Sequence, residues 1–93
     1  MSECQSPSVQ CLEHCCQLAI MDDKPIMMDY WKDSLNNKIL IGVKDDGEKL
    51  LVKSEDEYTS PVGKIYKVNE EYIIMTENSL YLVSSKIQTK RIS

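Results

Sequence analysis

Between Ile39 and Ile87 the sequence alternates between short apolar runs and short clusters of turn residues. Such runs, rich in β-branched and aromatic side chains, are typical of antiparallel strands joined by tight turns. The apolar runs lie at residues 39–43, 50–52, 64–68, 72–76 and 80–83, and the turn clusters include Asp45-Asp46-Gly47, Ser60-Pro61, Asn69-Glu70 and Asn78-Ser79. With a further alternating run at 25–31, this pattern predicts a six-stranded antiparallel meander.

An amphipathic segment precedes the strands. Its apolar residues recur at helical spacing, with polar residues on the opposite side. Ser6 and Pro7 are typical of the start of a helix, and Pro25 disfavours helical structure at the residue before it. We therefore expect an N-terminal helix over about residues 8–21, preceded by a disordered arm at 1–5.

The helix and the meander together predict an α+β fold, with the sheet curled toward a small barrel. A single small domain over residues 1–93 is expected for a chain of this length. This order of elements is similar to that of several small-barrel folds, including Sm-like and SH3-like ones. The glycine-marked strands with which those families bind nucleic acids or peptides are missing, so this likeness implies no function.

The register of the first hairpin is predicted from the side that it buries. A loop of two or four residues places Ile41 opposite Val52, so that the apolar residues of both strands share one face. A three-residue loop would instead mix Lys49 and Lys53 with the apolar set. Because register follows the buried face, the loop should have two or four residues. We expect four, over 45–48, because a two-residue loop would place the like charges of Asp45 and Glu48 opposite each other.

The last three strands, expected at about 62–68, 71–77 and 80–87, carry apolar residues on both faces. One face is expected to hold Tyr66, Ile74, Tyr81 and Val83. The other is expected to hold Ile65, Ile73, Met75, Leu80 and Leu82. A sheet with one solvated face shows clean alternation, so the N-terminal helix, closure of a barrel or another chain must cover the second face. A helix of about 13 residues covers only part of such a sheet, which favours a partner.

We therefore predict a non-catalytic role in protein–protein interaction or as a structural subunit of a larger assembly. Contact would be made through apolar sheet faces and strand edges, with another protein or a second copy of the chain. The candidate partner-binding residues are Trp31, Tyr66, Ile74, Tyr81 and Val83. Trp31 also suits a structural role, which we favour, because a single tryptophan can plug the open end of a small barrel.

A zinc-binding module is an alternative, because all four cysteines lie near the N-terminus. Cys11, His14 and Cys15 project from one side of the expected helix, and Cys4 could supply a fourth ligand. Structural zinc sites usually join two separate pairs of ligands, and the sequence holds no second pair. Since cysteine is among the most buried residue types, we expect structural thiols and no cofactor.

The acidic composition points to a second alternative, an inhibitor or regulator of a basic partner protein. The net charge is −4, which argues against a nucleic-acid partner because phosphate contacts need clustered lysines and arginines. The acidic runs Glu55-Asp56-Glu57 and Glu70-Glu71 would carry such binding. The paired carboxylates all fall at expected turns rather than in a cleft, so we do not expect an enzyme.

The expected location is intracellular and soluble, with no membrane partner. No apolar run approaches the ~20 residues that span a bilayer, and the N-terminus lacks the features of a secretory signal. The clustered cysteines favour a reducing compartment. The abundance of Lys, Ile and Asn is typical of an AT-rich genome, as many viruses have, so a virion component also fits.

Overall fold

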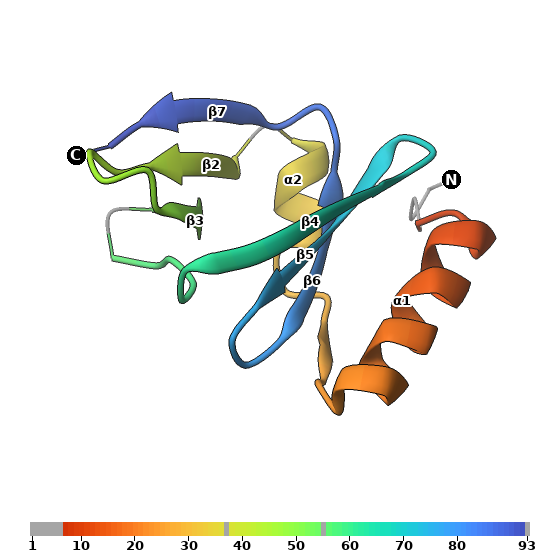
Figure 1. Cartoon of the computed structure of the whole chain (residues 1–93). Coiled ribbons are helices and arrows are strands. Elements are labelled where there is room, and N and C mark those ends of the chain that lie inside the picture. The colour runs from red at the N-terminus through yellow and green to blue at the C-terminus, as the bar shows by residue number, and fades with distance from the viewer. Residues whose placement is uncertain (1–6, 37, 55, 93) are drawn as a thin grey trace.

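The computed structural model describes residues 7–36, 38–54 and 56–92, and within them the chain has an α+β fold. The helices are α1 (Val9–Asp22) and α2 (Trp31–Leu35). The strands are β1 (Ile26–Met27), β2 (Leu40–Val43), β3 (Lys49–Val52), β4 (Val62–Val68), β5 (Glu71–Thr76), β6 (Leu80–Ser84) and β7 (Gln88–Arg91). They form a four-stranded sheet in the order β1-β6-β5-β4 and a three-stranded sheet in the order β3-β2-β7 (Figure 1).

Helix α1 confirms the expected N-terminal helix, shifted by one residue. The Ser8 hydroxyl accepts a hydrogen bond of 3.2 Å from the backbone N–H of Cys11, so Ser8 is the N-terminal cap. Pro7 therefore precedes the helix instead of occupying its first turn, and Ser6 lies outside the described residues, as does the arm expected at 1–5. The helix ends at Asp22 and is capped by Asp23, whose left-handed backbone has a φ of 53°.

The strand expected over 25–31 is wrong beyond its first residues. Only β1 is extended, and the chain then turns into α2, where a polar connection was expected. Trp31 and Leu35 lie one helical turn apart and both pack toward the same core. The Ser34 hydroxyl donates to the Trp31 carbonyl and accepts from the backbone N–H of Ser84, which fixes α2 against β6.

The sheets are mixed, so the expected antiparallel meander and its closure toward a barrel are both wrong. Strand β1 pairs parallel with β6, and β2 pairs parallel with β7. The last strand was expected to run to residue 87, but it ends at Ser84, where the Ser84 hydroxyl accepts from the backbone N–H of Lys86. The chain therefore leaves the first sheet and joins the edge of the second.

The β2–β3 hairpin has the three-residue loop that the sequence argued against. Ile41 pairs with Leu51 instead of Val52, and Gly47 adopts a φ of 90° in the loop. The prediction assumed that only one face of this hairpin is apolar. In the structure Ile41 and Leu51 point into the core, while Leu40, Leu50 and Val52 lie on the opposite face.

The two later hairpins confirm the expected antiparallel pairing of β4, β5 and β6. Asn69 has a φ of 55° in the first turn, while the second turn is at Glu77-Asn78, one residue earlier than expected. The expected faces are correct for most residues, but Tyr66 and Ile65 are exchanged. The β4–β5 pairing places Tyr66 opposite Ile73, so Tyr66 lies on the face of Ile73 and not on that of Ile74. The same pairing has a bulge next to Gly63.

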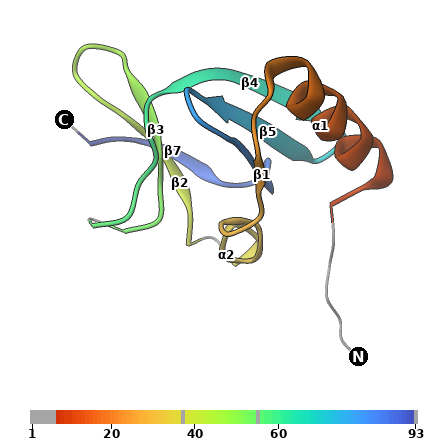
Figure 2. The same cartoon turned by 90° about the horizontal axis from the view of Figure 1, so that it is seen from below.

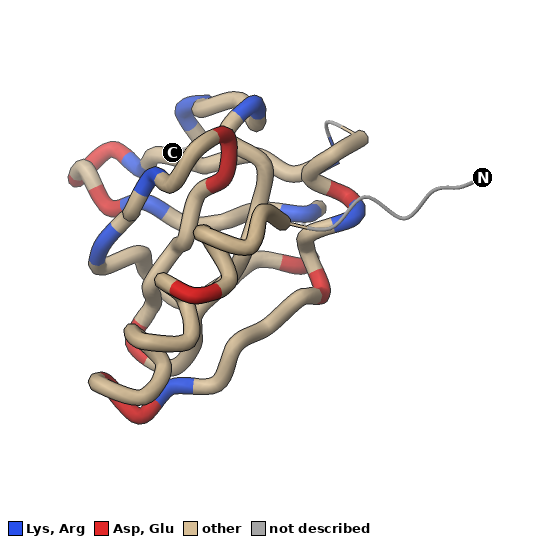
Figure 3. Tube along the Cα trace, turned by 90° about the vertical axis from the view of Figure 1, so that its right-hand side faces the viewer, with Lys and Arg blue, Asp and Glu red and all other residues tan. Residues whose placement is uncertain are grey.

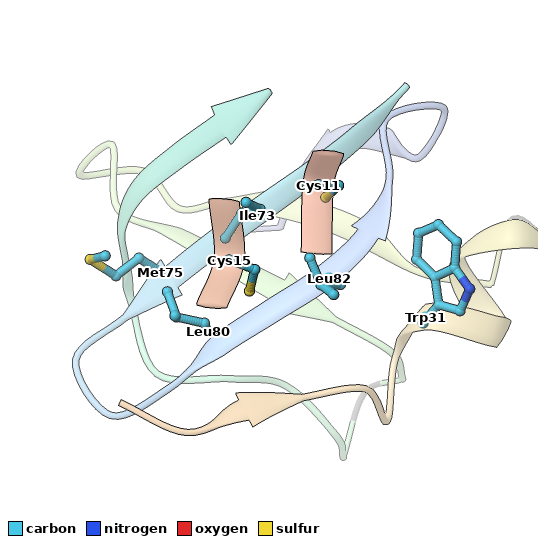
Figure 4. Close-up of a cluster of buried hydrophobic side chains, with 7 residues drawn as sticks. All are labelled: Cys11, Cys15, Trp31, Ile73, Met75, Leu80 and Leu82. Atoms are coloured by element: carbon cyan, nitrogen blue, oxygen red, sulfur yellow. The ribbon is translucent and has the colours of Figure 1, made fainter. Parts of the chain in front are cut away.

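Both faces of the four-stranded sheet are covered by the chain itself (Figure 2). The helix-side core, between this sheet and the two helices, is formed by Cys11, Cys15, Trp31, Ile73, Met75, Leu80 and Leu82 (Figure 4). The inter-sheet core, between the two sheets, is formed by Tyr30, Ile39, Ile41, Leu51, Ile74, Val83 and Ile87. Ile73 and Ile74 are both 0% exposed, so the premise that the late hairpins need a partner's cover is wrong.

Candidate functional site

The side chains proposed from the sequence as partner contacts are mostly core residues. Ile74 and Val83 are fully buried between the sheets, and Trp31 is 7% exposed at the end of the helix-side core. Tyr66 and Tyr81 are half-buried. The assignment of Trp31, Ile74 and Val83 to partner contact is therefore corrected: they stabilise the fold, and Trp31 fills a core instead of plugging a barrel.

The cysteines of α1 lie where an apolar side chain would lie. Cys11 and Cys15 point toward the four-stranded sheet, beside Ile73 and Leu82 (Figure 4). Burial raises the pKa of both thiols to about 11, with smaller contributions from Glu71 at Cys11 and from the neighbouring thiols at Cys15.

These positions do not assemble the zinc site considered from the sequence. A cysteine that ligates zinc must be a thiolate, and the raised pKa of these two thiols disfavours that form. His14 is exposed and lies beside Tyr66, with 6.2 Å between the ring centroids. Cys4 lies outside the described residues, and within them no three potential metal ligands gather.

The acidic runs do not form one surface in the described part of the chain. The turn between β4 and β5 and the segment between β3 and β4 lie at opposite ends of the molecule (Figures 1 and 2). Glu71 accepts a hydrogen bond of 2.8 Å from the Ser8 hydroxyl, and Glu70 lies 3.8 Å from the Lys86 ammonium. Acidic and basic residues also alternate over the side of the molecule seen in Figure 3. Glu55 is outside the described residues.

A polar cleft of about 430 Å³ lies between α2, the β4–β5 turn and the end of β6. Its polar groups bond to one another or to neighbours: Ser34 to the backbone of Ser84, Glu71 to Ser8, and Asn69 to both Ser8 and Gln10. No buried side-chain nitrogen or oxygen among the described residues lacks a partner. Glu70 and Lys86, which also line the cleft, are 77% exposed and lie 3.8 Å from each other.

An apolar groove of about 580 Å³ lies on the outer face of the β3-β2-β7 sheet. It is lined by Leu40, Lys44, Leu50, Val52, Lys53, Ser54, Tyr58 and Ile92. The register places Leu40 opposite Val52 and Gly42 opposite Leu50, all on the side away from the inter-sheet core. The groove was missed from the sequence because the predicted register considered only one apolar face, formed by Ile39, Ile41, Val43, Leu50 and Val52, and left out Leu40 and Leu51. The paired runs Leu40-Ile41 and Leu50-Leu51 were the signal for two apolar faces.

The C-terminal end of the chain forms one wall of this groove. The backbone N–H of Ile92 donates to the Val43 carbonyl at 2.9 Å, which carries the chain past the end of β7. The Ile92 side chain lies over Gly42, where a Cβ atom would come within 2.6 Å of Ile92 Cδ1. A glycine at position 42 therefore makes the space in which an aliphatic side chain packs onto the sheet.

The charged side chains among the groove's described lining residues are both lysines, one near each end of the hairpin. Lys44 lies 3.3 Å from Glu48 beside the β2–β3 loop. Lys53 follows β3, lies 3.2 Å from Asp33 and sits 5.8 Å from the centroid of the Tyr30 ring. The hydrogen bond to Asp33, together with that carboxylate's charge, raises the pKa of Lys53. The groove thus combines an apolar floor with a cation toward either end.

In the described residues no helix has the length and apolar character needed to cross a membrane. Comparison of the chain with models of known protein families, with curated proteins and with solved structures finds no match. By its elements and sheet order, the chain is an α+β domain with an N-terminal helix and two mixed sheets.

Proposed function

We propose that this protein is a non-catalytic interaction subunit that binds another protein through the outer face of its three-stranded sheet. The observation that carries this proposal is the difference between the two sheets. The four-stranded sheet is covered on both faces, whereas the outer face of the three-stranded sheet leaves Tyr58 58% exposed and Ile92 38% exposed around an apolar groove. Apolar patches of this kind mark interaction sites on soluble proteins.

Face packing suits this surface better than strand addition. Of the edge strands, β4 carries Lys64 and Lys67 and a bulge beside Gly63, and β7 carries Lys90 and Arg91. The edge of β3 is occupied by the chain itself, because the backbone N–H of Thr59 donates to the Leu51 carbonyl. Edge lysines and bulges are devices that discourage pairing with a further strand. The groove offers side-chain packing instead, with Leu50 as its buried floor.

We also propose an intracellular, soluble location for this subunit. Cys11, Cys15 and Cys16 are free thiols, and the first two are buried in the helix-side core. Free cysteines in a small domain are typical of a reducing compartment. Fractionation of the source cells, with the protein detected by antibody, tests this location.

Capture experiments with matched variants test the interaction. The double variant Tyr58→Ser/Ile92→Ser removes two exposed apolar walls of the groove. The variant Ile20→Ser removes a side chain of α1 that is 81% exposed and lies outside the groove. We expect the native chain and Ile20→Ser to retain the same specific partner in a pull-down from the native source, and the double variant to lose it while keeping its circular dichroism spectrum. Equal capture by all three proteins would contradict the proposal.

A further inference from the structure

We infer that the occupant of the groove is an extended segment of a partner protein, with aliphatic side chains at alternate positions and acidic residues at both ends. This inference rests on the interaction role proposed above and specifies the chemistry of the partner. It depends on three features of the groove: its length, the packing of Ile92 over Gly42, and the lysines near its two ends.

The length of the groove fits a short extended segment. Lys53 follows β3, and Lys44 lies opposite Glu48, which precedes β3. At about 3.4 Å per residue, this stretch of β3 corresponds to about 17 Å, or about five residues of an extended chain. A volume of about 580 Å³ has room for several aliphatic side chains.

Ile92 shows which side chains this face accepts. It belongs to an extended segment of the protein's own chain and packs its branched side chain over Gly42. An extended partner segment presents every second side chain to the same surface, so aliphatic residues at alternate positions would reach Leu40, Leu50 and Val52. Apolar packing of this kind supplies affinity without requiring a backbone hydrogen-bond partner.

The lysines of the groove indicate that the two ends of the segment are acidic. The lining charges are the ammonium groups of Lys44 and Lys53, whose side chains are 46% and 32% exposed. Lys44 is paired with Glu48 at 3.3 Å and Lys53 with Asp33 at 3.2 Å, and a carboxylate of the partner would share these lysines with those acids. Carboxylates on the partner, one near each lysine, therefore complement the groove.

A second copy of this chain fits the groove less well. Because a lysine lies toward either end, two grooves packed face to face would bring lysine against lysine in either relative direction. The partner that complements the groove is accordingly a different, carboxylate-bearing chain.

Synthetic peptides test the inference with the full chain. The first probe is a capped seven-residue peptide with Val, Ile and Val at alternate positions, Thr between them and Glu at both ends. The second replaces both Glu by Lys, and the third replaces the three aliphatic residues by Ser. Binding is measured from the shifts of backbone amide resonances and from isothermal titration, and self-association is measured by analytical ultracentrifugation.

We expect the Glu-ended peptide to bind at least about tenfold more tightly than the Lys-ended peptide, and the Ser peptide not to bind. The shifts should map to β2 and β3. The Lys44→Gln/Lys53→Gln variant should lose this preference for Glu, whereas the matched Lys64→Gln/Lys67→Gln variant on β4 should keep it. Raising the salt concentration should bring the affinities of the Glu-ended and Lys-ended peptides closer together, because salt screens the charges.

Four outcomes would overturn the inference. They are equal binding of the Glu- and Lys-ended peptides, binding of neither, shifts outside the groove, and a chain that dimerises through the groove. If the Glu- and Lys-ended peptides bind the native chain equally but do not bind the Tyr58→Ser/Ile92→Ser variant, the preference for acidic ends is wrong. The proposed interaction role is not contradicted by that result. If, in addition, that double variant captures the same proteins as the native chain, the proposed role fails as well.

Discussion

The two faces of the four-stranded sheet are equally dry but are covered in different ways. Helix α1, a single local element, covers one face together with α2, and the core between them contains two thiols, a tryptophan and a methionine. The other face is covered by the β2–β3 hairpin and by the distant strand β7, over a core of Ile, Leu, Val and Tyr. One face therefore depends on the formation of a helix, and the other depends on long-range pairing of β2 with β7.

The largest expected effect compares these faces directly. Ile73 and Ile74 are adjacent in β5, are both fully buried and face opposite cores. We expect Ile73→Ala and Ile74→Ala each to lower the free energy of unfolding by about 2–5 kcal/mol, because each leaves a cavity in a closed core. Urea unfolding followed by circular dichroism measures both.

The control for this comparison is Ile65→Ala, at a β4 position that is 37% exposed, which should cost under about 1 kcal/mol. A cost for Ile74→Ala as small as that of Ile65→Ala would mean that the three-stranded sheet does not cover this face in solution.

A second pair of substitutions compares the polar groups that hold each cover in place. Ser34 accepts from the backbone N–H of Ser84 on the helix side, and Thr59 accepts from that of Leu51 on the other side. We expect Ser34→Ala and Thr59→Val each to cost about 1–3 kcal/mol, since each leaves a buried N–H unpaired. Thr89→Val, at an exposed position of β7, is the control. Its free energy of unfolding, measured by thermal unfolding, should lie within about 0.5 kcal/mol of that of the native chain.

Alkaline pH should weaken the helix-side core first. The thiols of Cys11 and Cys15 have a pKa of about 11 in the folded protein against an ordinary value of 9.0, so the folded state holds these protons more tightly. Their contribution is complete below pH 9 and is lost as the pH rises to 11, at about 1–2 kcal/mol for each thiol. In the inter-sheet core, burial and the neighbouring Tyr81 raise the pKa of Tyr30 above 10.0, so its contribution is lost at higher pH.

The double variant Cys11→Ala/Cys15→Ala isolates the contribution of the thiols. Its free energy of unfolding should fall less between pH 9 and 10 than that of the native chain, as measured by urea titration at each pH. Equal slopes for the two proteins would show that the pKa of these thiols is the same in the folded and unfolded states.

The smallest expected effect is confined to the helix-covered face. Ser8→Ala removes the N-terminal cap of α1 and the hydrogen bond to Glu71, at a cost of about 1 kcal/mol. Hydrogen exchange should accelerate for the amides of α1 and stay unchanged in β2 and β3. Ser8→Thr retains a hydroxyl and serves as the control; acceleration across both sheets in Ser8→Ala would mean that the two covers open as one unit.

The parts of the fold that were predictable from the sequence depend on local patterns. Helical spacing placed α1, and turn residues such as Asn69-Glu70 placed the hairpins of β4, β5 and β6. Buried thiols were expected because Cys11 and Cys15 follow the apolar side of the helix. Helix α2 was missed because five residues are too few for a periodic pattern, and alternation at 25–31 resembled a strand.

The parts that were not predictable depend on pairing between distant segments. Strand β7 is polar and exposed throughout, so its sequence contains no sign that it joins β2. Without that second sheet, the apolar residues of β5 and β6 looked in need of an external cover. The groove was hidden for the same reason: its position depends on the register of β2 with β3 and on the return of Ile92 over Gly42.

The parallel pairing of β2 with β7 has a consequence for how the protein is made. Translation proceeds from the N-terminus, so β2 leaves the ribosome well before the strand that will lie beside it. A nascent chain that stops before Gln88 lacks the final strand of the second sheet and the Ile92 wall. The three-stranded sheet can therefore be completed only after β7 has left the ribosome, so the parallel pairing of β7 with β2 forms later than the local β2–β3 hairpin.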